Sequence, residues 1–351
     1  MPLSLKPLRD QTIVITGGSS GIGLATARRA VSRGAAVVLA ARNESALEEI
    51  RAELETRGGR VAICAADVSV EADVERIAAI AIQHFGGFDS WVNDAAAATF
   101  GSIEQITIED HRRIFDVNYH GLLMGSLVAA RHLRERGGGA IVNIGSVLSD
   151  RAMIYQGPYS ASKAAVQSAT DALRMELERE QVPISVTLIK PGSINTPYPE
   201  HARNYLAGPP RLPAPLYDPG LVARAILFAC EHHRRQIYVG GGGYAISLAG
   251  KFAPRLTDLV LERFGARVQQ KDDDPGDPAK RDNLHEPRRD GAEHGGQDVW
   301  VRQTSVLLEA QIQPLLLPIA AAVAGLEVLG DLARLSRLSR VSRSAPRYGS
   351  P

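Results

Sequence analysis

The chain contains little cysteine and carries almost no net charge. Only two of its 351 residues are cysteines, Cys64 and Cys230, and their separation fits no metal-binding motif. We expect both thiols to be buried, in a protein of a reducing cytoplasmic compartment. The formal net charge of +1 provides no overall field that would attract nucleic acid. These scarcities argue against a cysteine-built metal site and against a nucleic-acid partner.

Long apolar runs are also scarce. Residues 1–10 contain no apolar core of the kind that a secretory signal peptide has. The mostly apolar stretch 314–330 is shorter than the roughly 20 residues that span a bilayer, and it includes Glu327 and two prolines. An arginine-rich tail follows it, as would flank an anchor on the cytoplasmic side. Membrane association, a helix docked on the core and disorder all remain open for this stretch.

Residues 11–250 show a regular alternation of short apolar runs and longer amphipathic stretches. Runs that are apolar throughout are typical of parallel strands covered on both faces, and the stretches between them predict βαβ units. We therefore predict an α/β fold, a Rossmann-type doubly wound parallel sheet of seven strands with helices on both faces. The predicted strands are 12–16, 36–40, 61–65, 90–93, 140–144, 185–189 and 236–239, and the predicted helices include 21–33, 44–57, 71–85 and 108–136.

The composition divides the chain into a core, residues 1–250, and a C-terminal extension. Residues 251–268 predict an amphipathic helix that could cover a substrate cleft, contact a partner subunit or lie on a membrane. Residues 269–300 are rich in charge, proline and glycine and predict a disordered linker. Residues 301–351 are first apolar and then rich in arginine and serine. Within the core, the long segment 191–219 carries eight of the 20 prolines, which indicates a loop that is either functional or disordered.

A glycine-rich turn follows the first predicted strand and opens the first predicted helix. It reads Thr-Gly-Gly-Ser-Ser-Gly-Ile-Gly over residues 16–23. Gly17 and Gly21 permit backbone angles and a close approach that a side chain would block, and Gly23 lets the helix pack against the strand. The free amides at the helix start, together with the helix dipole, favour a bound diphosphate. The turn therefore predicts a dinucleotide site. A simple strand-turn-helix is the alternative.

The end of the second predicted strand bears on the choice of dinucleotide. A carboxylate there would accept a hydrogen bond from a ribose 2′-hydroxyl and repel a 2′-phosphate. Ala40 and Ala41 stand at these positions, and Arg42 follows. Because a guanidinium pairs with phosphate in a forked geometry, we predict NADP(H) in preference to NAD(H). A solvated surface charge is the other interpretation of Arg42.

Three polar residues suggest a proton-transfer site. Tyr159 and Lys163 are four residues apart, so on a helix they share one face, and Ser146 precedes Tyr159 by thirteen residues. A nearby ammonium favours the phenolate and should lower the pKa of Tyr159 from its usual value of about 10. Ser146 could hydrogen-bond a substrate oxygen beside the transferring proton. Hydride must come from a cofactor, because no side chain supplies one.

These motifs together resemble the short-chain dehydrogenase/reductase family. Its turn reads Thr-Gly-x-x-x-Gly-x-Gly, and its catalytic set of Ser, Tyr-x-x-x-Lys and a preceding Asn is matched here, the last by Asn118. The resemblance covers about residues 8–250. Residues 93–96, Asn-Asp-Ala-Ala, depart from the family's Asn-Asn-Ala-Gly at two positions. Ala96 thus places a methyl group where the family has glycine next to the cofactor.

The resemblance implies a role for each matching residue. Asn118 would hold a water that links Lys163 to solvent, although a kink or a satisfied polar residue is the alternative. The implied catalytic residues are Asn118, Ser146, Tyr159 and Lys163. The implied cofactor-binding residues are Thr16, Gly17, Ser19, Ser20, Gly21, Ile22, Gly23, Arg42, Asp67, Val68, Asn93, Ala95, Ala96, Tyr159, Lys163, Pro191, Gly192, Ile194 and Thr196.

The expected function is reversible, NADP(H)-dependent interconversion of a carbonyl and a secondary alcohol, with an apolar or bulky substrate. One alternative is an NADP(H)-binding sensor or scaffold with little turnover, and another is an NAD-linked dehydrogenase of the same fold. No metal is expected. By resemblance, the assembly would be a homodimer or homotetramer that uses the helices at 108–136 and 159–180.

Overall fold

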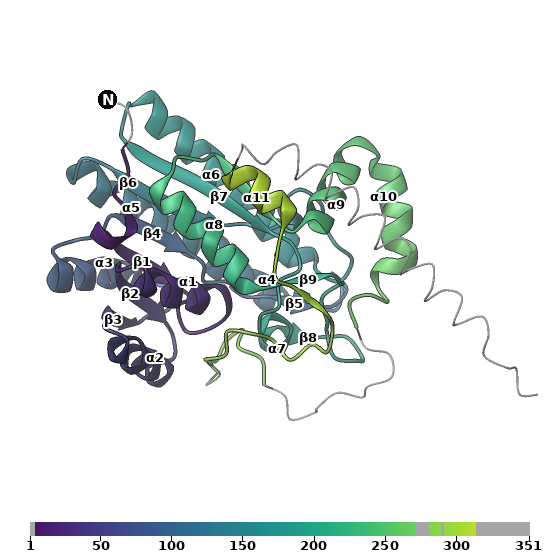
Figure 1. Ribbon diagram of the computed structural model, residues 1–351. Coiled ribbons are helices and arrows are strands. Elements are labelled where there is room, and N and C mark those ends of the chain that lie inside the picture. The colour runs from purple at the N-terminus through teal and green to yellow at the C-terminus, as the bar shows by residue number, and fades with distance from the viewer. Residues whose placement is uncertain (1–3, 271–280, 289–290, 314–351) are drawn as a thin grey trace, which may run out of the picture.

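The computed structural model describes residues 4–270, 281–288 and 291–313. The seven predicted strands form one parallel sheet in the order β10-β7-β6-β4-β1-β2-β3 (Figure 1). The strand order reverses between β1 and β4, so the sheet is doubly wound, and the predicted fold is confirmed. The strands are β1 (Thr12–Thr16), β2 (Ala36–Ala41), β3 (Arg60–Ala65), β4 (Ser90–Asn93), β6 (Gly139–Ile144), β7 (Ile184–Pro191) and β10 (Gln236–Val239).

Helices cover both faces of this sheet, which explains why the strands are apolar throughout. Successive residues of a strand point to opposite faces, so Ile13 and Ile15 enter one core cluster while Val14 enters the other. One face is covered by α1 (Gly21–Ser32), α2 (Glu44–Thr56) and α8 (Pro219–Glu231). The other is covered by α3 (Glu71–Phe85), α4 (Ile108–Phe115), α5 (Leu122–Glu135) and α6 (Gly157–Arg179).

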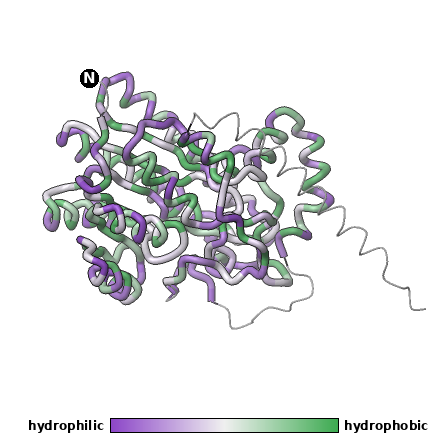
Figure 2. Tube along the Cα trace, viewed as in Figure 1, coloured by the Kyte–Doolittle hydropathy of each residue, from purple (hydrophilic) through white to green (hydrophobic). Residues whose placement is uncertain are grey.

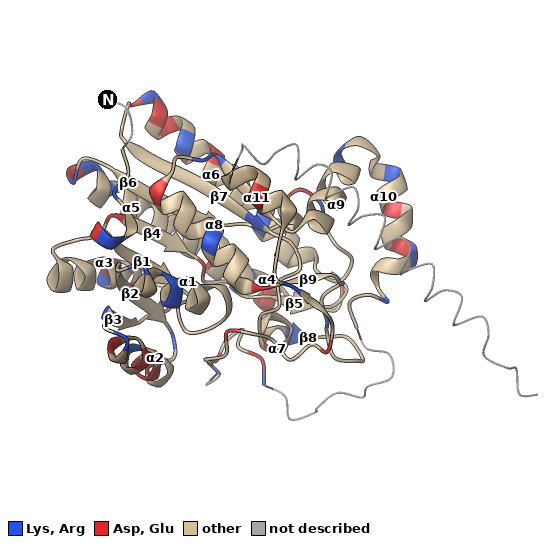
Figure 3. Cartoon of the chain, viewed as in Figure 1, with Lys and Arg blue, Asp and Glu red and all other residues tan. Residues whose placement is uncertain are grey.

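Hydropathy and charge follow this layering. The central strands are mostly hydrophobic and the outer helices mix hydrophilic and hydrophobic residues (Figure 2). Residues of both charge signs lie along α10, whereas the charged residues of α2 are mainly acidic (Figure 3). Both cysteines are buried, Cys64 in β3 and Cys230 in α8, as expected.

The predicted helix 108–136 is interrupted in its middle. A π-helical segment, Asp116–Gly121, lies between α4 and α5, and it contains Asn118. The side chain of Asn118 bonds to the backbone of Ala97 instead of pointing to solvent. Such bulges often mark functional sites.

Short elements complete the core. They are the 3₁₀ turns Leu8–Asp10 and Val147–Ser149, the helix α7 (Tyr198–His201), and two two-stranded pairs. In one pair β5 (Thr99–Phe100) lies beside β8 (Arg203–Asn204), and in the other β9 (Leu216–Tyr217) lies beside β11 (Val301–Arg302) of the extension.

The extension begins differently from the prediction of one helix over 251–268. The helix α9 (Gly241–Phe252) starts before the predicted segment, and α10 (Pro254–Val260) follows after a break at Ala253. The break has a local cause, because a residue before proline is disfavoured in the helical region. A π-helical turn, Leu261–Gly265, ends this part.

The structure does not agree with a disordered linker over 269–300 where it describes that stretch. Gln269 is buried and its amide oxygen accepts a hydrogen bond from Gln156 Nε2 at 2.6 Å. Leu284 is 1% exposed and belongs to a core cluster. The charged composition suggested disorder. In the structure, however, Asp282 pairs with Arg203 and Glu293 pairs with Arg28. Long-range partners of this kind are not visible in local composition.

The last described helix, α11 (Val306–Ile312), packs on the edge of the sheet. Gln311 binds the backbone of Tyr238 in β10 at both its N–H and its C=O, each at 2.9 Å. Arg224 of α8 and Glu309 form a two-bond ion pair. Leu308 is fully buried in the core cluster of α1 and α8. These contacts make residues 301–313 part of the folded unit.

None of the helices in the described ranges is long and apolar enough to cross a membrane. The stretch 314–330, for which membrane association was left open, lies outside the described residues.

Truncating Leu308 tests whether α11 belongs to the cooperative core. We expect Leu308→Ala to lower the free energy of unfolding by about 2–5 kcal/mol, the usual cost of a buried Leu→Ala change. Leu256→Ala is the matched control, because Leu256 is 64% exposed. Denaturant unfolding of the full chain measures both. Equal stability of the two variants would show that α11 is not coupled to the core.

Candidate active site

A large pocket lies at the carboxyl ends of the sheet strands. It is lined by residues that follow β1, β2, β3, β4, β6 and β7, and by residues of α6, α9 and the extension. Parallel strands deliver the loops after them to one edge, which is why segments distant in sequence meet there. The predicted site residues that line the pocket are Gly17, Ser19, Ser20, Gly21, Ile22, Arg42, Asp67, Val68, Ala95, Ala96, Ser146, Tyr159, Lys163, Pro191, Gly192, Ile194 and Thr196.

Four predicted residues lie behind the pocket wall. Thr16 Oγ1 accepts hydrogen bonds from the backbone amides of Asp94 and Ala95, at 3.2 and 3.3 Å. A Cβ at Gly23 would come within 2.3 Å of the Gly17 carbonyl oxygen, so the helix can approach the turn only with glycine there. Thr16 and Gly23 therefore support the pocket wall from behind and do not line the pocket themselves.

Asn93 also lies inside the protein, in a polar network between β4, β6 and the helices. Its amide nitrogen donates to Asn143 Oδ1 at 2.8 Å and to Ser126 Oγ at 3.1 Å, and its oxygen accepts from Trp91 Nε1 at 2.7 Å. These bonds use both amide hydrogens and one lone pair of the oxygen inside the protein, so the Asn93 side chain is not among the groups that line the pocket. The sequence predicted that Asn93 contacts the cofactor, whereas the structure places its side chain in this internal network.

Asn118 is engaged in a similar way. Its oxygen accepts from the Ala97 amide at 2.7 Å, and its nitrogen donates to the Ala97 carbonyl at 2.9 Å and to Ser162 Oγ at 3.0 Å. Ser162 is the neighbour of Lys163. The side chain therefore fixes the loop after β4 against α6, and a water relay to Lys163 would have to use other groups.

The glycine turn has the geometry of a cradle. Gly17 has φ of 73°, and a Cβ on it would lie 2.9 Å from the backbone of Ala95. Gly21 has φ of 51°, and its absent side chain leaves room for Thr196 at 3.3 Å. Ser20, the residue before α1, makes no side-chain cap bond, so the start of the helix is not closed by its own cap. This cradle fits a dinucleotide diphosphate.

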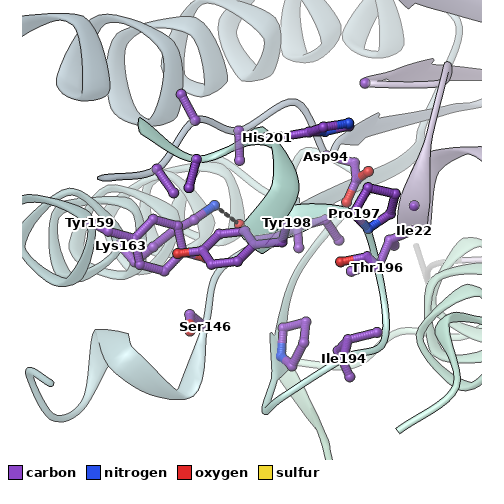
Figure 4. A pocket seen from close by; sticks show the side chains of 18 of the residues that line it. Ile22, Asp94, Ser146, Tyr159, Lys163, Ile194, Thr196, Pro197, Tyr198 and His201 are labelled. Carbon is purple, nitrogen blue, oxygen red and sulfur yellow. Dashed lines mark hydrogen bonds between the residues drawn. The ribbon is translucent and has the colours of Figure 1, made fainter. Parts of the chain in front are cut away.

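The three proton-transfer candidates come together on one side of the pocket (Figure 4). Lys163 Nζ donates to the Ile144 carbonyl at 2.7 Å and lies 5.7 Å from the centre of the Tyr159 ring. Ser146 lies near enough to the Tyr159 phenol to oppose the rise of its pKa. Ser146 Oγ accepts from the Leu148 amide at 3.0 Å, which fixes its direction.

The acidities in this group differ from the expectation in one respect. Burial raises the pKa of the Tyr159 phenol above its usual value, and this effect outweighs the opposing effect of Ser146. Burial also lowers the pKa of Lys163 to about 8, against the opposing charge of Asp94. The predicted lowering of the Tyr159 pKa is thus wrong, because removal from water penalises the phenolate and the charge of Asp94 raises the pKa further.

Asp94 was not among the predicted site residues. It lines the pocket, and the Gly23 amide at the start of α1 donates to its carboxylate. Burial raises the pKa of Asp94 to about 7, and the charge of Lys163 opposes that rise. The signal for it in the sequence is the departure at this position from the family's Asn.

Another part of the pocket wall is largely apolar, and most of its residues were not predicted from the sequence. The Tyr198 ring packs edge-on against Tyr159 with centroids 5.4 Å apart, and its hydroxyl donates to Gln156 Oε1 at 2.9 Å. The further apolar lining residues are Leu148, Met153, Leu212, Ala214, Pro215, Tyr217, Ile246 and Leu261. The proline-rich segment 191–219 predicted a loop that is either functional or disordered, but its pocket-facing residues could not be identified from composition.

Arg42 lines the pocket at the end of β2, as predicted, but its guanidinium has protein partners. It donates to the carbonyl of His285 at 2.9 Å, to that of Leu284 at 3.3 Å, and to that of Asn283. Asp67 pairs with Arg113 at 2.6 Å and accepts from Ser69. Asn283, Pro287 and Arg288 of the extension line the same end of the pocket.

Comparisons with known proteins agree with this geometry. The family model for short chain dehydrogenases matches residues 11–205. An uncharacterized oxidoreductase, YxnA, of Bacillus subtilis is 45% identical over 326 residues, which cover 92% of this chain and 91% of that protein. The 3beta-hydroxysteroid dehydrogenase 1 of Eggerthella lenta is 37% identical over 193 residues, which cover 54% of this chain and 73% of that protein.

A solved structure is similar to about two thirds of the chain. The L-sorbose reductase of Gluconobacter frateurii, complexed with NADPH and L-sorbose, has a TM-score of 0.58 and 26% identity. The match covers 69% of this chain and 98% of that one. The residues that the family model matches include the glycine turn, Ser146, Tyr159 and Lys163. This chain belongs to the short-chain dehydrogenase family of oxidoreductases.

Proposed function

We propose that this protein is an NADP(H)-dependent oxidoreductase that interconverts a carbonyl and a secondary alcohol. The observation that carries the proposal is the joint placement of Ser146, Tyr159 and Lys163 in the pocket that the glycine turn also lines. The turn would hold the diphosphate of a nicotinamide dinucleotide, and that cofactor would supply or accept the hydride. The protein side chains then need only to orient the substrate and move a proton.

In carbonyl reduction, Tyr159 is the proton donor. Its raised pKa keeps the phenol protonated at neutral pH, so the proton is available to the substrate oxygen. Ser146, which lines the pocket beside Tyr159, would donate to the same oxygen as negative charge develops on it. Lys163 holds a positive charge beside the phenol and stabilises the phenolate left after proton transfer. Asn118 acts as a positioning residue through Ala97 and Ser162.

A preference for NADP(H) is supported by three features. No carboxylate stands at Ala40 or Ala41 to repel a 2′-phosphate, and Arg42 and Arg288 both line that end of the pocket. The L-sorbose reductase neighbour is described with NADPH. The partners that Arg42 already has are backbone carbonyls of the extension, and these would share the guanidinium with a phosphate.

The substrate class is proposed from the lining. Beyond Tyr159 the pocket wall consists of aliphatic and aromatic side chains, among them Met153, Tyr198 and Leu212. Leu261 shows that the extension contributes to this wall. The similar proteins act on different substrate classes by name, a hydroxysteroid for the Eggerthella lenta dehydrogenase and a sugar for the L-sorbose reductase. The apolar wall favours a bulky, apolar carbonyl compound or alcohol.

Assembly through α5 and α6 is also proposed. Leu127 of α5 and Met175 of α6 are 52% and 56% exposed, and such apolar side chains would suit a helix-to-helix contact in a homodimer or homotetramer.

The role of Tyr159 predicts a large loss on removal of one hydroxyl. We expect Tyr159→Phe to reduce turnover by at least about a hundredfold while NADPH still binds, because only the proton donor is lost. Consumption of NADPH with a panel of apolar ketones and aldehydes measures the rate. Tyr205→Phe is the matched control, since its hydroxyl bonds to Asp110 away from the pocket. Full activity of Tyr159→Phe would refute this function.

Replacing Ala41 with a carboxylate should change the cofactor preference. In Ala41→Asp the new charge would repel a 2′-phosphate and accept a hydrogen bond from a 2′-hydroxyl, so we expect the ratio of NADPH to NADH affinity to fall at least about tenfold. Fluorescence titrations with both dinucleotides give the ratio. A wild-type chain that binds NADH more tightly than NADPH would contradict the proposal.

The reduction rate should fall as pH rises above about 8. The pKa of Lys163 is lowered to about 8, so its ammonium is present below that pH and is lost above it. In Asp94→Asn the fall should begin at lower pH, because the Asp94 charge raises the pKa of Lys163. Profiles of kcat/KM against pH for both chains provide the comparison, and identical profiles would remove Asp94 from this account.

A further inference from the structure

Part of the extension lies along the outer side of the dinucleotide pocket. Its residues 281–288 and 291–300, called the strap below, run beneath α1 between α2 and α7 (Figure 1). The inference below rests on the proposed function, because it concerns the exchange of the dinucleotide.

At the adenosine end, the strap holds the residue predicted to recognise the 2′-phosphate. Arg42 donates to the carbonyls of residues 283–285, and Asn43 Nδ2 donates to the Arg288 carbonyl at 2.6 Å. Arg113, which pairs with Asp67, donates from Nε to the Leu284 carbonyl at 3.0 Å. Two residues predicted to contact the adenosine half of the cofactor are thus linked to the strap by hydrogen bonds. Arg42 is linked directly, and Asp67 is linked through Arg113.

The strap is anchored at this end by a buried side chain and an ionic group. Leu284 is 1% exposed and shares a core cluster with Val68 and Val117, two residues that line the pocket. Asp110, also 1% exposed, pairs with His285 of the strap at 2.8 Å. These anchors show that the strap is held by specific contacts.

At the diphosphate end, the strap occupies one of the amides at the start of α1. Gly21 N donates to the Ala292 carbonyl at 3.0 Å. Glu293 pairs with Arg28 of α1 at 2.8 Å. A diphosphate held by the glycine turn would use the same helix start. The strap and a bound dinucleotide would therefore compete for the backbone amide of Gly21.

At the nicotinamide end, the strap contacts the loop that carries Thr196. Gly295 N donates to the Asn195 carbonyl at 3.3 Å, and a Cβ on Gly295 would lie 2.4 Å from the Thr196 carbonyl oxygen. Gly296 N donates to Glu200 Oε1 at 2.8 Å. The strap thus spans the pocket from its adenosine end to its nicotinamide end.

The comparisons separate the strap from the common core. The L-sorbose reductase structure is covered over 98% of its length by 69% of this chain, which leaves about a hundred residues of this chain without a counterpart there. By contrast, 92% of this chain is covered in the match with YxnA, so most of the extension is included.

We propose that the strap gates exchange of the dinucleotide: the nucleotide enters and leaves only when the strap releases Gly21 and Arg42. Loosening the strap then speeds association and dissociation together and leaves the chemical step of the loaded enzyme unchanged. The contacts of the strap at Gly21 and Arg28 lie away from the 2′-position, so this part of the gate acts on NADPH and NADH alike.

The test uses two variants of the full chain that loosen the strap from its own side. Glu293→Gln removes the ion pair to Arg28, and Leu284→Ala removes the buried anchor. Glu53→Gln is the matched control for the first, because Glu53 pairs with the same Arg28 at 2.7 Å from α2. Leu308→Ala is the control for the second, as a buried leucine of the extension that is not in the strap.

Stopped-flow fluorescence measures binding of NADPH and its displacement by excess NADP⁺. We expect both rate constants to rise at least about threefold in each strap variant and to stay at the wild-type value in the controls. Hydride transfer in a single turnover of preloaded enzyme should not change. If Leu284→Ala fails to fold, Glu293→Gln alone decides.

Two results would overturn the proposal in distinguishable ways. NADPH binding to the wild-type chain with exchange rates unaffected by Glu293→Gln would refute the strap and leave the proposed function intact. A wild-type chain that binds neither NADPH nor NADH would refute both.

Discussion

The site depends on one buried cation. Lys163 is 2% exposed, and its ammonium group donates to the carbonyl of Ile144, the last residue of β6. A charge removed from water is tolerated only when polar groups replace its hydration, and here a strand end and the nearby Asp94 carboxylate do so. This bond joins α6 to the sheet. It therefore fixes Tyr159 one turn away and Ser146 just beyond the same strand end.

The opposing effects of burial and charge explain how this group works. Burial alone moves the pKa of Tyr159 upward and that of Lys163 downward, so each group is drawn toward its neutral form. A phenol that stays protonated suits the donor role in carbonyl reduction. The cost of forming a phenolate is then met at the moment of proton transfer by the adjacent ammonium. The prediction of a lowered Tyr159 pKa considered only the nearby ammonium charge. Desolvation has the larger effect on this pKa and raises it.

The extension changes the character of the common core. The sheet, the glycine turn and the proton-transfer group are shared with relatives of ordinary length, but here a further segment is bonded to the edge of the dinucleotide pocket. Arg42 illustrates the consequence, because one guanidinium faces both a predicted phosphate and three backbone carbonyls of the extension. Cofactor recognition and the position of the extension are physically coupled at that side chain.

The sequence by itself determined the seven strands, their helical connections and the glycine-turn and proton-transfer residues of the pocket. Those depend on local patterns: apolar runs, a glycine turn, and spacings such as that of Tyr159 and Lys163. Only the tertiary structure decided that Asn93 and Asn118 face inward, that Asp94 lies near Lys163, and that residues around Leu284 are ordered. Each of these results depends on partners far away in the chain, such as Asn143 for Asn93 and Arg42 for the strap. Burial and long-range hydrogen bonds arise only when the sheet brings those segments together.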